Sequence, residues 1–313
     1  MKKPFPENFP SIYREMVLQA HDRGLNLLMT SGQACLFYKL CHATKDADLI
    51  MESSKSGQIL EFLEEYRPPH WESPRYHPLS PPLDSSWMKG GWSVHIEYPG
   101  KSDHPDLRLD FFGCAPRASH PLPNPSDEVY ADRETVAQMK MTRRLKDWDS
   151  VNYLGLQMLA EGNPRGLLYI FNGEHFHRSS MNPTSELIAE RPLLALLEST
   201  RNDIDTLTGA ADAERTAWMT LDKVRLLTYS QALRPFLKNL PPHNCNTSFQ
   251  EQHQMRVDIA KQHLDPRPIA SFGVETLMDD VLKRLERMGM SEHHRSLLPI
   301  PRFRASLDAV IQN

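Results

Sequence analysis

The spacing of hydrophobic residues predicts alternating helices and strands in the first part of the chain. Apolar residues recur at helical intervals in residues 11–23, 33–42 and 57–66. Two short apolar runs, 25–30 and 47–51, lie between these segments and are typical of buried strands. This alternation indicates a domain that mixes both kinds of element.

Proline separates these elements from a second pair of strands. Residues 68–82 contain six prolines, a density that prevents a helix or an interior strand and predicts an ordered or lid-like loop. Beyond it, residues 92–98 alternate between apolar and polar side chains, and residues 107–112 form another apolar run. Turn-forming residues lie between the two, at 98–103, so we expect a hairpin.

The rest of the chain is predicted to be helical. A second proline-rich loop covers residues 116–125, and residues 133–159 have the pattern of one long helix. Further helical patterns cover residues 185–199, 213–240, 249–264, 274–288 and 303–311. The expected fold class is α+β, with a small mixed-sheet domain over residues 1–160 followed by an all-helical domain over residues 161–313.

Charge and hydropathy argue against two classes of protein, general nucleic-acid binders and membrane proteins. The 313 residues include 36 basic and 40 acidic side chains, a formal net charge of −4. That balance argues against a protein whose whole surface binds nucleic acid, although it permits a local basic face. No apolar run approaches the ~20 residues that cross a bilayer, and no signal-peptide pattern is visible. We expect a cytoplasmic protein with no membrane partner.

Cysteine and histidine offer no obvious metal cluster. Cys35, Cys41, Cys114 and Cys245 form no Cys-x-x-Cys pair, and we expect them to be small apolar side chains in a reducing compartment. The histidine pairs at 175/177 and 293/294 lack a cysteine or acid at ligand spacing. The candidate chemistry therefore lies with the acids.

Aspartate pairs separated by one residue occur three times, at positions 46/48, 147/149 and 203/205. In a strand, side chains two residues apart point to the same face, whereas on a helix they diverge. The pair at 147/149 falls within a predicted helix, and the pair at 203/205 lies at a predicted helix start. Only Asp46 and Asp48 continue into an apolar strand, so they are the candidate metal ligands.

A third acid lies on the predicted strand at 107–112. Asp110 shares a face of that strand with Arg108, while Asp106 at its start is the weaker candidate. Mg²⁺ prefers a few carboxylates together with waters and phosphate oxygens. We predict that Asp46, Asp48 and Asp110 are catalytic and hold a divalent metal. The alternative is that these acids are ordinary solvated charges at the ends of strands.

Ser31 and Gly32 form the turn between the first strand and the following helix. Free backbone N–H groups at a helix start, and the missing side chain of glycine, would let a phosphate approach closely. Any strand-to-helix turn also favours serine and glycine. The turn becomes a candidate nucleotide-binding site only because Asp46 follows the same helix.

Together these motifs resemble the nucleotidyltransferase superfamily of the polymerase-beta type. The chain is most similar to minimal nucleotidyltransferases and abortive-infection toxin nucleotidyltransferases, which begin with Gly-Gly-Thr/Ser-Ala and continue to an Asp-hydrophobic-Asp strand. The matching segments are Ser-Gly-Gln-Ala at 31–34 and Thr-Lys-Asp-Ala-Asp-Leu at 44–49, and the resemblance covers residues 25–155. Two residues depart from it: Ser31 replaces the first glycine, and Gln33 replaces the usual hydroxyl residue.

Basic residues follow the third acid. Lys140, Arg143, Arg144 and Asp147 would share one face of the predicted long helix, which is either a solvated surface or the wall of a cleft that meets phosphate. The segment also resembles the Arg-x-Lys-Asp-x-x-Asp motif of related nucleotidyltransferases. That likeness implies nucleotide-binding roles for Arg144, Lys146 and Lys140, alongside Ser31 and Gly32.

The resemblance implies an enzyme that uses Mg²⁺ or Mn²⁺ to move a nucleotidyl group from an NTP to an acceptor. The acceptor would be RNA such as tRNA, a protein or a small molecule, in a toxin–antitoxin or phage-defence setting with an antitoxin partner. The alternative is a catalytically inactive relative that binds a nucleotide or a partner. The changes at Ser31 and Gln33 favour the alternative, and the three acids oppose it.

Overall fold

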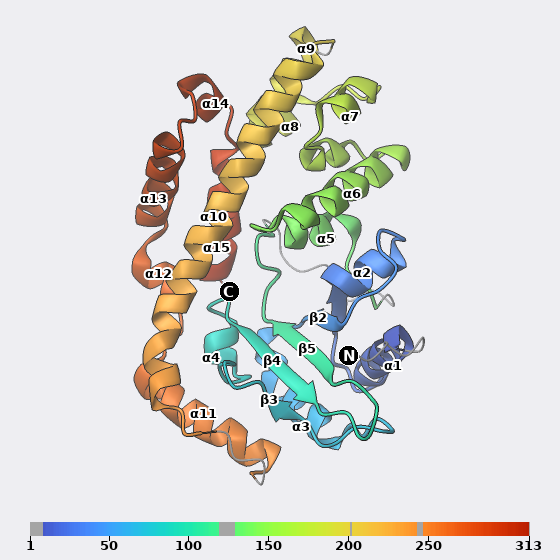
Figure 1. Cartoon of the computed structure of the whole chain (residues 1–313), viewed down its shortest axis with the longest axis vertical. Coiled ribbons are helices and arrows are strands. Elements are labelled where there is room, and N and C mark those ends of the chain that lie inside the picture. Colours follow the sequence, from blue (N-terminus) through green and yellow to red (C-terminus); the bar gives the residue numbers. More distant parts are fainter. Residues whose placement is uncertain (1–8, 119–128, 201, 243–246, 313) are drawn as a thin grey trace.

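A five-stranded mixed sheet forms the centre of the N-terminal part of the computed structural model (Figure 1), which describes residues 9–118, 129–200, 202–242 and 247–312. The strands, in spatial order, are β1 (Leu28–Thr30), β2 (Asp46–Ile50), β5 (Leu107–Phe112), β4 (Ser93–Tyr98) and β3 (Arg75–Tyr76). β2 and β5 run parallel, and the other neighbours are antiparallel. The predicted hairpin is confirmed as β4–β5, and β1 lies beside β2.

One face of the sheet is covered and the other carries polar side chains. Apolar residues of β2, β4 and β5 are buried with the helices α1 (Phe9–Asp22) and α3 (Ser56–Glu65). In β5 burial alternates strictly from Leu107 onwards, as expected of a strand with one face toward a core. The helix α2 (Ser31–Phe37), the turn η1 (Ser53–Lys55) and the short helix α4 (Ser85–Met88) connect these elements.

The remainder of the described chain is helical. Its elements are α5 (Arg133–Lys140), η2 (Leu145–Asp147), α6 (Trp148–Ala160), η3 (Pro164–Tyr169), α7 (Gly173–Arg178), α8 (Ser185–Glu190), η4 (Pro192–Ala195), α9 (Leu196–Ser199), α10 (Ile204–Asn239), α11 (Phe249–His263), α12 (Pro268–Phe272), α13 (Val274–Arg287), α14 (Glu292–Ser296) and α15 (Ile300–Ile311). Figure 1 shows α10 running along most of the molecule and past the sheet. The α+β class, with its mixed sheet first and helices after it, is confirmed.

One hydrophobic core joins the two predicted domains. It extends from Leu28 in β1 and Ile50 in β2 to Leu307 in α15. Leu154 of α6 and Leu167 of η3, which lie on opposite sides of position 160, are both fully buried in it. The division into 1–160 and 161–313 stays a prediction.

The predicted long helix at 133–159 is wrong. α5 ends at Lys140 and α6 begins at Trp148. Between them Thr142 donates its hydroxyl to Asp147 Oδ2 at 2.6 Å, and the Arg144 backbone N–H donates to Thr142 Oγ1 at 3.1 Å. Such side-chain bonds compete with the helical ladder. The basic residues around position 143 therefore do not share one helical face.

Proline and capping residues explain two other differences. The predicted helix at 185–199 is interrupted, because Pro192 begins a separate turn after α8. α10 begins at Ile204, earlier than predicted, where the side chain of Asp203 accepts from the Thr206 backbone N–H at 3.0 Å. The expectation that 203/205 lies at a helix start is confirmed.

The first proline-rich segment, 68–82, is ordered and includes β3. That strand lies at the edge of the sheet, where proline-rich sequence is tolerated. The second proline-rich segment lies partly outside the described residues, at 119–128, as does Cys245. Cys35 and Cys114 are buried free thiols. Among the described helices, none combines the length and the apolarity that crossing a membrane requires.

Candidate active site

The three predicted acids lie on neighbouring strands and on the same face of the sheet. In the parallel pairing of β2 with β5, Asp48 is directly opposite Asp110, and Asp46 is opposite Arg108. Since side chains two residues apart in a strand point the same way, Asp46 and Asp48 share the face of Asp110. Local sequence explains this placement: buried Ala47, Leu49 and Leu109 face the core, so the intervening acids face away.

Burial and the charge of Asp110 raise the pKa values of Asp46 and Asp48. Burial and the nearby Asp110 carboxylate raise the pKa of Asp48 from its ordinary 3.8 to about 6, against a hydrogen bond from Ser31 and the charge of Lys140. Burial and Asp110 also raise the pKa of Asp46, against Arg108 and Arg144. Each carboxylate is thus destabilised as an anion by its surroundings, and a bound cation would relieve this.

His95 is a site residue that the sequence patterns missed. It lies opposite Asp110 in the β4–β5 hairpin, and its Nδ1 is 2.5 Å from Asp110 Oδ1. Burial lowers the pKa of His95, but the hydrogen bond and the charge of Asp110 outweigh this and raise it overall. The available signal was the hairpin register: pairing Tyr98 with Leu107 places position 95 opposite position 110.

Ser31 and Gln33, on either side of Gly32, contact the strand that carries Asp46 and Asp48. Ser31 adopts the left-handed region at φ 51°, uncommon for a residue with a Cβ, and bonds to Asp48. A Cβ at Gly32 would lie 2.2 Å from Thr44 Oγ1, so the glycine permits the close approach of Thr44. Gln33 is buried and donates to the Asp46 backbone carbonyl at 3.3 Å.

Two of the three predicted basic residues act on the acids. The charge of Lys140 lowers the pKa of Asp48, and the charge of Arg144 lowers that of Asp46. Both also pair with buried Asp147: Lys140 Nζ at 3.6 Å and Arg144 Nε at 2.7 Å. Lys146 is exposed on η2 and is not among the charges that act most strongly on the acids.

A cleft of about 370 Å³ opens on the acidic face. Asp46, Asp110 and His95 line it from the sheet, His77 lines it from the first proline-rich segment, and Leu233 lines it from α10. Burial lowers the pKa of His77. The proline-rich segment and the long helix therefore form walls of the candidate site.

The residue types of the candidate site are those that a hard divalent cation prefers. Three carboxylates with no cysteine match the oxygen preference of Mg²⁺ and Mn²⁺. Burial, and after it the charge of Asp110, raises the pKa values of Asp46 and Asp48, and nearby bases offset this only in part. Within the described ranges, no three acidic, histidine or cysteine side chains already form a group close enough to hold a metal ion.

Comparison with known proteins gives no family for this chain: no family model, no curated protein and no solved structure matches it.

Proposed function

We propose that the protein is a metal-dependent nucleotidyltransferase that moves a nucleotidyl group from an NTP to an acceptor. The observation that carries the proposal is the row of acids on β2 and β5, with Asp48 directly opposite Asp110 and Asp46 on the same face. The three carboxylates share a polar face, burial and Asp110 raise the pKa values of Asp46 and Asp48, and Asp46 and Asp110 line a cleft. Such an arrangement suits phosphoryl transfer.

Asp46, Asp48 and Asp110 would hold Mg²⁺ or Mn²⁺, which supplies charge neutralisation on the phosphates and acidifies an attacking hydroxyl. The neighbouring residues then have definite tasks. His95 holds the Asp110 carboxylate through its Nδ1 contact, and both residues line the cleft. Lys140 and Arg144 are placed by Asp147 beside the acids, where they neutralise charge on the leaving pyrophosphate.

Ser31 and Gly32 complete the proposed nucleotide pocket, with Lys146 as a more distant contributor. The Ser31 hydroxyl bonds to Asp48, so the turn and the acids form one unit. Backbone N–H groups at the start of α2 would face the phosphates of the NTP. The acceptor would be RNA such as tRNA, a protein or a small molecule, and an antitoxin is the partner that the resemblance suggests.

A second candidate is a protein that binds a nucleotide or partner without turnover. Gln33 favours it, because this residue is buried and bonded to the Asp46 backbone instead of presenting a hydroxyl to phosphate. Ser31 also engages Asp48, which leaves its hydroxyl less available to a nucleotide. The two candidates differ only in whether the acids support transfer.

A label-transfer assay distinguishes the two candidate functions. The wild-type protein is incubated with each NTP labelled at the α-phosphate, Mg²⁺ or Mn²⁺, and total cell RNA or lysate, beside Asp46→Asn and Asp48→Asn. We expect transfer of label and release of pyrophosphate, with a loss of about 100-fold or more in either variant. Asp205→Asn, an exposed acid at the start of α10, is the matched control and should retain full activity.

Nucleotide binding without acid-dependent transfer, under every NTP and metal tried, would support the second candidate. Transfer that persists unchanged in both variants would contradict the proposed site.

A further inference from the structure

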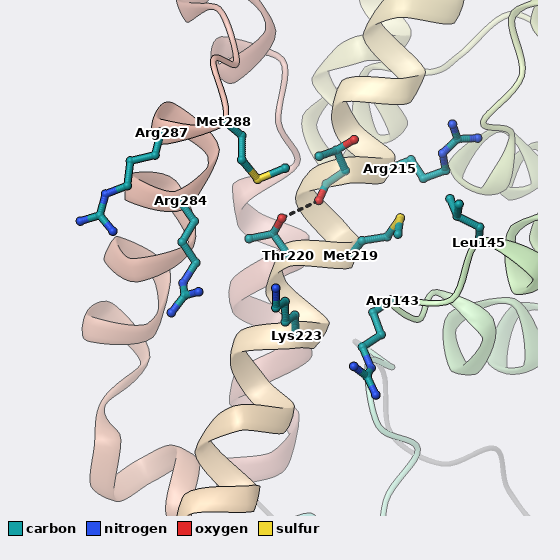
Figure 2. A pocket seen from close by; sticks show the side chains of 10 residues that line it. Arg143, Leu145, Arg215, Met219, Thr220, Lys223, Arg284, Arg287 and Met288 are labelled. Atoms are coloured by element: carbon teal, nitrogen blue, oxygen red, sulfur yellow. Dashed lines mark hydrogen bonds between the residues drawn. The ribbon is translucent and has the colours of Figure 1, made fainter.

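A basic groove lies between α10, α13 and the segment that precedes η2, apart from the cleft over the acids (Figure 2). Its volume is about 700 Å³. Five cations line this α10–α13 groove: Arg143 before η2, Arg215 and Lys223 on α10, and Arg284 and Arg287 on α13. Figure 2 shows α10 between the other two segments, with Arg284 and Arg287 on one side of it and Arg143 on the other.

The charge of the groove contrasts with that of the whole chain. The formal net charge is −4, yet no acidic side chain is among the residues that line the groove. Arg215 pairs with Asp212 at 2.8 Å and Arg284 with Asp280 at 3.0 Å, both partly exposed pairs of the kind that holds a cation only weakly. Within the described ranges, Arg143, Lys223 and Arg287 take part in no ion pair.

One segment of chain contributes both to the groove and to the candidate active site. Arg143 lines the groove, while Arg144, the next residue, acts on Asp46. The Arg143 backbone N–H donates to Asp222 Oδ2 at 3.0 Å, and Arg117 Nη1 donates to Asp222 Oδ1 at 2.9 Å. This buried carboxylate fixes the segment on α10, beside Lys223 of the groove. The segment between α5 and α6 therefore supplies one cation to the groove and the next to the acids.

We propose that the α10–α13 groove binds one strand of a polynucleotide through its phosphates and positions that strand as the acceptor. The acceptor role rests on the proposed function, whereas strand binding does not. Four of the five cations are arginine, whose planar fork suits phosphate oxygens. A cavity of about 700 Å³ has room for a short stretch of one strand.

The lining also predicts how the strand is recognised. None of the described residues that line the groove is aromatic, so bases have no stacking platform there. Leu145 and Met288, which are 67% and 63% exposed, offer only apolar contact. Binding should therefore depend on phosphate charge, with little preference for base sequence and a strong dependence on salt.

Salt-dependent binding of a fluorescein-labelled oligouridylate tests the groove. Fluorescence anisotropy is measured with the full chain in EDTA, without metal or NTP, over a range of salt concentrations. If all five cations contact phosphate, log K against log [salt] should have a slope of about −3.5. Arg284→Ala/Arg287→Ala should weaken binding at least about tenfold at low salt and reduce the slope by about 1.4. Lys223→Ala, on α10, should reduce the slope by about 0.7.

The matched control is Arg178→Ala/Lys261→Ala, which removes two exposed cations from α7 and α11, away from the groove. It should bind as the wild type does. Equal binding by the groove variants and the wild type would overturn the proposal, as would competition by poly-glutamate that is tighter than the oligonucleotide itself, since the groove would then suit an acidic peptide.

The two proposals fail separately. Asp46→Asn/Asp48→Asn should keep full oligonucleotide binding, because these acids do not line the groove. Groove-dependent binding without label transfer to any acceptor would contradict the proposed function alone. Label transfer to RNA that is unaffected by Arg284→Ala/Arg287→Ala would contradict the acceptor role of the groove alone.

Discussion

The ionised carboxylate of Asp48 destabilises the folded, metal-free protein. Its folded-state pKa of about 6 exceeds its ordinary 3.8, so the folded protein loses this proton less readily than the unfolded chain does. Stability from this group is therefore fully present below about pH 4 and is lost as the pH rises through about 6. Negative charge at Asp110, directly opposite, is one cause, and burial is the larger one.

Asp48→Asn should consequently stabilise the metal-free protein above pH 6. We expect a gain on the order of 1–2 kcal/mol in urea unfolding at about pH 7.5, and no gain at about pH 4. Asp205→Asn, which changes an exposed acid, should change little at either pH. An equal effect of Asp48→Asn at both pH values would show that the carboxylate is not destabilised in the folded state.

The variant Gly32→Ala tests how closely the turn packs against Thr44. Gly32→Ala places a Cβ 2.2 Å from Thr44 Oγ1, so it should destabilise the protein by about 1–3 kcal/mol in chemical unfolding. Gly57→Ala in α3 meets nothing within 4 Å and should instead be neutral or stabilising, by up to about 1 kcal/mol. Thr44→Ala should partly rescue Gly32→Ala. Identical stability changes at both glycines would contradict the contact.

At this scale the sequence predicted the acids but not their partners. Strand periodicity placed Asp46 and Asp48 on one face and gave Asp110 the same face as Arg108, because alternation is a local property. His95 could not be recognised from its neighbours, since its role depends on the pairing of β4 with β5. Gly32 was predicted for phosphate approach, whereas the structure also requires it for Thr44, which is remote in spacing from the turn.

The segment between α5 and α6 connects the acids to the helices. Its conformation depends on Asp222, which lies far along the chain on α10 and accepts from the backbone of Arg143. Burial opposes the ionisation of Asp222, but the charges of Arg117 and Arg225 outweigh it and lower its pKa. No periodicity over residues 133–159 reports this long-range contact, and for that reason the helix break was not predicted.

Asp222→Ala should release that segment. It leaves Arg117 and Arg225 buried without their carboxylate, so we expect a loss of about 3–5 kcal/mol in urea unfolding, and a smaller loss for Asp222→Asn, which keeps hydrogen-bonding capacity. Asp212→Ala, which breaks the partly exposed pair with Arg215, should cost at most about 1 kcal/mol. Similar losses for Asp222→Ala and Asp212→Ala would argue against a structural role for Asp222.

At the scale of the whole molecule, the order of strands followed by helices was predictable, since it follows from local patterns and proline positions. The way the two parts join was not. Leu28 in β1 and Leu307 in α15 belong to one hydrophobic core, and the faces that meet there carry no sequence signal of their partner.

The shared core predicts cooperative unfolding. Calorimetry of the full chain should give one transition, and a fragment of residues 1–160 should unfold at a markedly lower temperature, because the buried face of α6 loses its contacts with η3. Two well-separated transitions, or a fragment as stable as the full chain, would contradict the shared core and favour two independent domains.

The central claim is that Asp46, Asp48 and Asp110 together hold the cation for nucleotidyl transfer. Anomalous diffraction from crystals grown with Mn²⁺ and a non-hydrolysable NTP analogue tests it most directly. The account predicts an anomalous peak bounded by these three carboxylates, with the phosphates of the analogue beside it. Ordered nucleotide with no peak at the three acids, or with Mn²⁺ bound elsewhere, would contradict it.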